Sequence, residues 1–180
     1  MNIFVLDKDP IIAAKLHCDK HTPKMVVESA QMLSTAHRIL DGVESRRPSK
    51  SGKSMSRYWE LKDNRESILY KAVHMHHPCT VWTMQSSENY DWHWRLFSAL
   101  CDEYTYRYGK IHKTDSELRK ILANQPKNIP SGKLTKWPLA MKSNPECMFD
   151  DTVKSYRAFY KTKQERFKMV WTKRQKPEWF

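Results

Sequence analysis

Glycine is scarce in this 180-residue chain, which contains only four. A fold built only from strands needs many tight turns, so this scarcity argues against an all-β protein. None of the four cysteines stands in a Cys-x-x-Cys pair, which argues against a zinc ribbon or a thioredoxin-type site. No hydrophobic run approaches the length of a membrane span, and the apolar start is too short for a signal peptide. We therefore expect an intracellular, cytoplasmic protein with reduced thiols and no membrane partner.

Two common catalytic signatures are also missing. The chain has no Gly-x-Ser-x-Gly nucleophile elbow. Gly52-Lys53-Ser54 matches the end of a phosphate-binding loop, but the required first glycine falls on Arg47, which rejects that motif. Histidines and cysteines gather at 17–21 and 74–79 without a carboxylate at the usual hydrolase spacing. We expect no metal and no cofactor, and keep a metal-dependent nuclease built on these clusters as an alternative.

Acidic residues are outnumbered, 20 against 32 basic ones, for a formal net charge of +12. Such an excess favours a polyanionic partner, most simply nucleic acid, over a basic surface without a dedicated partner. Two segments are especially basic, the loop at 43–58 and the C-terminal region. Trp179 can stack on bases there, although docking of the terminal aromatic residues on the core is favoured. The expected nucleic-acid contacts are Lys20, Lys24, Arg46, Arg47, Lys50, Lys53, Lys161, Lys163, Lys173, Arg174 and Trp179.

The hydrophobic pattern predicts an all-α, compact, single-domain helical fold over 1–180, with irregular connections. Aromatic residues spaced three and four apart predict the clearest helix, at 87–108, closed by Gly109. Residues 43–58 are expected to form a basic flexible loop or loose hairpin, and 124–147, with four prolines, an irregular crossover. The other expected helices begin at Asp9-Pro10 and Thr22-Pro23, span 63–73, open with a Thr114/Glu117 capping box, and run from Asp150 or Asp151 to about Thr172.

Glu28 stands in an otherwise apolar and small stretch of the expected helix that Gly42 ends. A carboxylate there must be paired or functional, because burial of an unpaired charge is costly. His21 precedes it by seven residues, which is two helical turns, so a continuous helix presents both side chains on one face.

One chemistry that suits such a carboxylate uses an amine as the nucleophile. An amine can attack the sugar C1′ of a nucleotide, expel the base and leave a Schiff base, after which elimination cuts the strand. An α-amine, with an ordinary pKa of about 7.7–8.0, is neutral near pH 7 more easily than a lysine. The carboxylate then stabilises the cationic sugar and manages protons. Lys20 and Lys24 are the competing amines, and an ordinary ion pair between Lys24 and Glu28 is the plain structural alternative.

The Asp19-Lys20-His21…Glu28 element resembles the Asp-Gln-His…Glu stretch of the phage endonuclease V family of pyrimidine-dimer DNA glycosylases, with the same spacing from His to Glu. Three looser similarities keep the chain order. His76-His77-Pro78 is similar to an Asn-His-Pro of bacterial relatives, 88–111 to the long central helix, and 176–180 to an Arg-Pro-x-Trp-Tyr tail.

This resemblance implies an all-α DNA repair glycosylase and AP lyase that acts on duplex DNA in a bacterial or phage-infected cell. It implies an N-terminal amine as nucleophile, on Met1 or on Asn2 if Met1 is removed, with Glu28 as the catalytic carboxylate and His21 in the DNA site. Recognition of the dimer then involves bending the duplex and extruding a nucleotide. A nucleic-acid-binding protein without catalysis is the main alternative.

Overall fold

The structure, a computed structural model, describes residues 1–49 and 51–180. It is mostly helical, with seven α-helices and one two-stranded hairpin in the described part, which confirms the expected all-α class. No helix there is both long enough and apolar enough to cross a membrane. In chain order the elements are α1 Pro10–Leu16, α2 His21–Asp41, β1 Val43–Pro48, β2 Met55–Glu60, α3 Arg65–Ile68, α4 Pro78–Gln85, α5 Ser87–Tyr108, α6 Lys113–Leu122, the 3-10 turn η1 Pro145–Cys147, α7 Thr152–Lys161 and the 3-10 turn η2 Thr162–Glu165.

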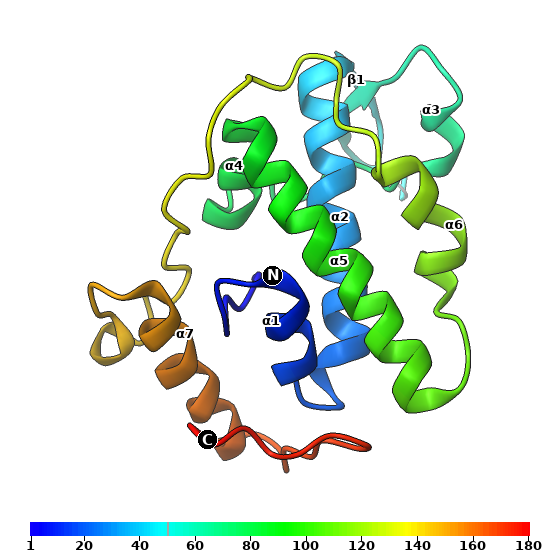
Figure 1. Cartoon of the computed structure of the whole chain (residues 1–180). Coiled ribbons are helices and arrows are strands. Elements are labelled where there is room, and N and C mark those ends of the chain that lie inside the picture. Colours follow the sequence, from blue (N-terminus) through cyan, green and yellow to red (C-terminus); the bar gives the residue numbers. More distant parts are fainter. Residues whose placement is uncertain (50) are drawn as a thin grey trace.

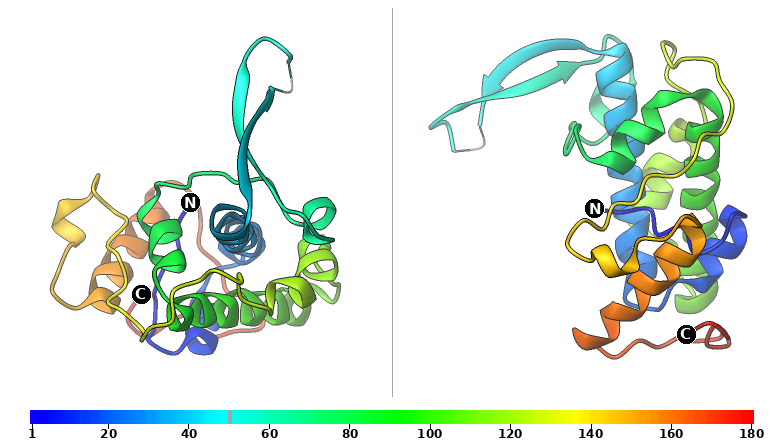
Figure 2. Two further views of the ribbon diagram at one scale, coloured as in Figure 1. Left: turned by 90° about the horizontal axis from the view of Figure 1, so that it is seen from above. Right: turned by 90° about the vertical axis from the view of Figure 1, so that its left-hand side faces the viewer.

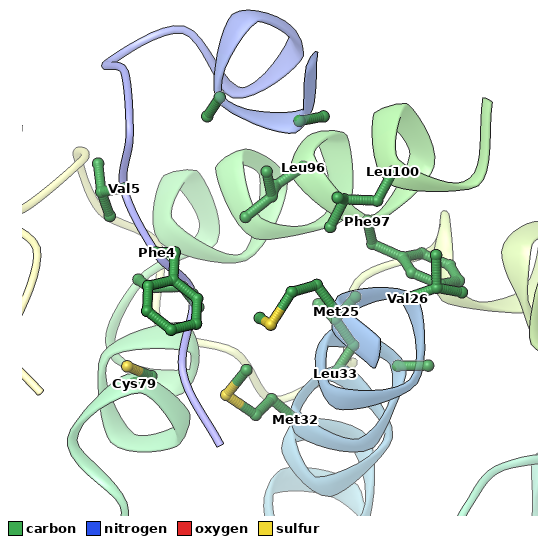
Figure 3. Packing of buried hydrophobic residues seen from close by; sticks show 14 of the residues in the cluster. Phe4, Val5, Met25, Val26, Met32, Leu33, Cys79, Leu96, Phe97 and Leu100 are labelled. Carbon is green, nitrogen blue, oxygen red and sulfur yellow. The ribbon is translucent and has the colours of Figure 1, made fainter. Parts of the chain in front are cut away.

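Two long helices, α2 and α5, pack against each other and form the centre of the molecule (Figure 1). The α5 helix begins at the cap Ser86 and ends at Gly109, whose left-handed φ of 67° suits glycine, and this confirms the predicted boundaries. α1 packs on α5, α6 contacts both central helices, and α4 packs across both of them. The N-terminal segment lies inside this arrangement, where the buried Phe4 and Val5 belong to one core cluster with methionines of α2 and leucines of α5 (Figure 3).

The basic segment expected as a loop or loose hairpin forms an antiparallel hairpin, which we call the arm (residues 43–60). The arm projects far from the helical body (Figure 2). At its base, Gly42 allows a close approach, because a Cβ there would lie 2.4 Å from the carbonyl oxygen of Arg38. Lys50, one of the expected nucleic-acid contacts, lies outside the described residues.

The helix predicted at 63–73 is wrong in length, because only the single turn Arg65–Ile68 forms. The cause is Arg38, whose buried guanidinium donates hydrogen bonds to the carbonyl oxygens of Glu66, Leu69 and Tyr70 at 2.7–3.0 Å. These carbonyl groups are satisfied by a side chain from α2 instead of by a continued helix. The spacing of hydrophobic residues does not indicate that Arg38 will be buried against these carbonyl groups, so the sequence predicts a longer helix.

The last predicted helix is also too long. α7 ends at Lys161, and after η2 the chain leaves helical conformation. Tertiary contacts hold this tail: Trp171 is buried and donates its indole N–H to the carbonyl of Leu16 at 2.9 Å, and the Asp19 backbone N–H donates to Val170. The aromatic end of the chain packs on the body, since Trp179 meets the ring of Tyr160 edge-on and Phe180 meets Trp171.

Two helix starts differ from the prediction. α4 begins at Pro78, where no helix was expected. Proline suits the first helical position because the N–H that it lacks would have no partner there, and the His77 side chain accepts from the Cys79 N–H. α6 begins at Lys113, where the His112 imidazole accepts from the Thr114 N–H, so the predicted Thr114/Glu117 capping box is not formed. Residues 124–147 run as a connection with η1 as its regular turn.

Candidate active site

The N-terminus lies beside Glu28. The α-amino nitrogen of Met1 is 3.7 Å from Glu28 Oε1, and the Asn2 backbone N–H donates to Glu28 Oε2 at 2.9 Å. The Glu28 side chain is only 14% exposed, so the carboxylate is held between these two nitrogens with limited access to water. The apolar stretch of sequence around Glu28 therefore accommodates a carboxylate because the chain's own terminus pairs with it.

Local sequence explains why the terminus reaches this place. Ile3 is fully buried, and Asn2 folds its side chain back to accept from the N–H groups of Ile3 and Phe4 at 2.7 and 3.0 Å. The Asn2 amide also donates to the carbonyl of Ala140 at 3.1 Å, across the irregular connection. Phe4 takes a left-handed φ of 37° and sends its ring into the core. Buried side chains and a capped turn thus fix the position of the α-amine.

A cavity of about 240 Å³ opens at this point. The α2 helix contributes one wall and the region from α7 to the 3-10 turn η2 and beyond contributes the other. Three cationic side chains line it together with aromatic rings, a combination suited to a sugar and its phosphates. The lining residues that carry this chemistry are Met1, Asn2, His21, Lys24, Glu28, Phe159, Lys163, Arg166 and Phe167.

Lys24 is the nearest competing amine. Its Nζ lies 3.6 Å from Glu28 Oε1, one turn before it on α2, and the side chain is more than half exposed. Lys163 is a second competitor that the sequence did not single out as an amine nucleophile. Burial lowers the pKa of Lys163, and the nearby Arg166 lowers it further. The cavity thus contains three amines whose roles need separate tests.

His21 lies on the same helix as Glu28 and lines the same cavity, as the spacing predicts. Its ring stacks on Phe4 at 5.2 Å and meets Tyr160 and Phe167 edge-on at 5.0 and 5.3 Å. Burial, together with the smaller effects of His17 and Lys24, lowers the pKa of His21 to about 3. At neutral pH the imidazole is therefore an uncharged member of an aromatic wall, suited to contact a sugar or base rather than a phosphate.

The buried histidines predict a stability that falls in mild acid. Burial lowers the pKa of His17 and His37 to about 4 and that of His93, like His21, to about 3. At a pH between these folded-state pKa values and the ordinary histidine pKa of 6.5, the unfolded chain binds protons that the folded chain does not. Stability is therefore lost as the pH falls through this range. For one such histidine the loss between pH 7 and pH 5 is about 2 kcal/mol. We expect urea midpoints to fall over this range and the fall to be smaller in His21→Phe; an equal fall in both proteins would contradict the assigned burial.

Asp19, the first residue of the Asp-x-His element, has a structural role. Its carboxylate pairs with the buried Arg107 at 2.9 Å and accepts from the Thr172 N–H and hydroxyl. It therefore joins α5 and the C-terminal tail to the turn before α2. This anchoring places the tail beside the cavity wall that contains Phe167.

The histidine clusters do not converge. In residues 1–49 and 51–180, no group of three His, Cys, Asp or Glu side chains is placed to hold a metal ion. His17 is fully buried, with Nδ1 2.8 Å from the Ala13 carbonyl oxygen, and Cys18 lies in the core. Burial raises the pKa of Cys79 to about 12, so this thiol near the N-terminus stays protonated.

The expected nucleic-acid contacts fall into separate regions. Lys24 and Lys163 line the cavity, and Lys20 lies over the ring of Phe167 at its edge. Lys173 is exposed and donates to the Tyr106 carbonyl, and the partly buried Arg174 pairs with the buried Glu103 carboxylate at 2.8 Å.

Five further residues of this set lie elsewhere. Lys161 is exposed and shares a second hollow with Trp179, whose ring packs against the body. Arg46, Arg47 and Lys53 belong to the arm. Arg166 also lines the cavity, although it is not among the predicted contacts. Its only signal in the sequence is its position in a basic stretch.

Searches for similar proteins found no matching family model, no matching curated protein and no matching solved structure.

Proposed function

We propose that this protein is a DNA repair glycosylase with AP lyase activity, which acts on damaged, pyrimidine-dimer-containing duplex DNA through its N-terminal amine. The observation that carries the proposal is the α-amine of Met1, 3.7 Å from the Glu28 carboxylate, in a cavity lined by cations. The Asp-x-His…Glu element that resembles the endonuclease V family supplies Glu28 and His21, and both line this cavity.

The proposed reaction proceeds in two stages. The neutral amine attacks C1′, a nitrogen–carbon bond forms, and the bond from C1′ to the damaged base breaks as the base leaves with a proton. Glu28 stabilises the positive charge on the sugar and accepts the proton that the amine loses. The C1′–O4′ bond of the sugar ring then breaks and O4′ takes up this proton, which leaves a protonated Schiff base between C1′ and the amine. Loss of a proton from C2′ then expels the 3′ phosphate, and water releases the enzyme.

A chain from which Met1 has been removed still has an α-amine beside Glu28. The Asn2 nitrogen already lies 2.9 Å from Glu28 Oε2, so a chain that begins at Asn2 has its amine beside the same carboxylate. Either end is held by burial of Ile3 and by the Asn2 side-chain hydrogen bonds. The proposal therefore requires a free terminus but not a particular first residue.

The second candidate is a duplex-binding protein without catalysis. It is favoured by the Lys24–Glu28 pair, because anchoring of the N-terminal segment by a carboxylate between Lys24 and the terminus explains Glu28 without any chemistry. The two candidates share the basic surface and differ in covalent chemistry.

Reduction with borohydride during reaction on a duplex with one abasic site separates them. We expect a covalent protein–DNA adduct at neutral pH, formed equally well with a chelator present, because borohydride reduces the Schiff base to a stable amine. Duplex binding without any adduct or cleavage would favour the non-catalytic candidate, and cleavage that leaves no adduct and is lost in chelator would point to a metal-dependent nuclease.

A further inference from the structure

The arm has two faces that differ in charge. In its register Arg46 lies opposite Arg57, and Arg47 lies opposite Ser56. Because side chains alternate along a strand, these pairs belong to opposite faces. The Arg46 face consists of Glu44, Arg46, Pro48, Met55, Arg57 and Trp59, and the Arg47 face of Val43, Ser45, Arg47, Ser56, Tyr58 and Glu60.

The Arg47 face neutralises its own charge. Arg47 pairs with Glu60 at 2.9 Å, and its guanidinium lies 3.7 Å from the centre of the Tyr58 ring. Tyr58 in turn donates to Glu66 of α3, so this face is tied to the body. Arg47 therefore acts as a structural residue of the arm, although its sequence position predicts a phosphate contact.

The Arg46 face keeps an excess of positive charge. Arg57 is held by Glu44 at 2.7 Å and 2.9 Å, but Arg46 is exposed and makes no ion pair within the described residues. Two arginines directly opposite on a hairpin repel each other, unless an anion lies between or beside them. The exposed Lys53 adds a further positive charge at the end of the arm.

The end of this face is apolar and exposed. Pro48 pairs with Met55, which is 55% exposed. Arginines beside an apolar wedge of methionine or proline are typical of side chains that enter a groove of duplex DNA and part a base step. A two-stranded ribbon also has a width that a DNA groove accepts.

Buried hydrogen bonds fix the arm at its base, and the arm extends on the side of the molecule where the N-terminus lies. Arg38, fully buried, donates to the Trp59 carbonyl at 2.9 Å and to Glu66 at 2.7 Å, which joins the arm to α2. Both views in Figure 2 show the arm extending from the side of the molecule on which the N-terminus lies. A duplex on that side can reach the arm and the cavity together.

We propose that the Arg46 face of the arm binds a groove of the same DNA duplex whose damaged nucleotide enters the cavity. The identity of the partner rests on the proposed function, but the division between the two faces rests on the arm alone. Arg46, Arg57 and Met55 contact DNA, and Arg47 does not.

Two neighbouring substitutions test this. Arg46→Gln and Arg47→Gln make the same change on opposite faces, and binding of a duplex oligonucleotide is followed by fluorescence anisotropy from about 50 to 200 mM salt. For the wild type we expect affinity to fall steeply as salt rises. For Arg46→Gln we expect several-fold weaker binding and a slope of log K against log salt that is flatter by about one unit. Arg47→Gln should keep the wild-type slope and melt at a lower temperature. Equal losses in both variants, no loss in Arg46→Gln, or no duplex binding by the wild type would each overturn the proposal.

Borohydride trapping keeps the two proposals separate. If Arg46→Gln weakens binding while the wild type forms no adduct, the arm binds DNA and the catalytic proposal fails. If the wild type forms the adduct and Arg46→Gln binds like the wild type, the catalytic proposal stands and the arm proposal fails.

Discussion

Replacement of Glu28 by glutamine is expected to lower strand cleavage by roughly 100-fold or more, with duplex affinity within a few-fold of the wild type. The carboxylate lies 3.7 Å from the α-amine and lines the cavity where the cationic sugar forms. The amide has the same shape and can still accept from the Asn2 N–H, but it carries no charge to stabilise the intermediate. Single-turnover cleavage of an abasic duplex measures the effect.

A matched control is available on α6. Glu117 also forms an i, i+4 ion pair, with Lys113 at 3.6 Å, and is exposed and absent from the cavity lining. Glu117→Gln should cleave like the wild type. Melting temperatures of both variants decide whether Glu28 merely anchors the terminus: wild-type cleavage by a folded Glu28→Gln protein would show that the carboxylate takes no part in the chemistry.

Extension of the N-terminus by a few residues is expected to abolish the borohydride adduct. The extension converts the α-amine into an amide, which cannot form a Schiff base, and it pushes chain into a cavity of about 240 Å³. Because blockage alone could give the same result, a second protein keeps its native end and replaces Lys20, Lys24 and Lys163 by arginine. This protein should still form the adduct, since arginine keeps the charge but does not react.

The central helices and the cavity differ in how well the sequence predicts them. The spacing of aromatic residues along α5 and the Asp9-Pro10 start of α1 are local signals, and the structure confirms both. The seven-residue interval from His21 to Glu28 predicts that they share a helix face, since α2 is continuous over both. These are properties of one helix and need no tertiary information.

The missed features depend on contacts between distant segments. Arg38 ends the helix expected at 63–73 through carbonyl groups about thirty positions away, and Asp19 holds the tail where a longer helix was expected. The second cavity wall, with Lys163 and Arg166, comes from the far end of the chain. Basic composition predicts an anionic partner. It could not distinguish Arg174, paired with the buried Glu103, from Arg46, which makes no ion pair with any residue that the structure describes.

The most direct test of the account is the site of covalent attachment. After borohydride trapping on an abasic duplex and nuclease digestion, proteolysis and mass spectrometry identify the peptide that bears the sugar remnant. The account predicts that the remnant is on the α-nitrogen of the first residue, Met1 or Asn2. A remnant on Lys24 or Lys163 would contradict it.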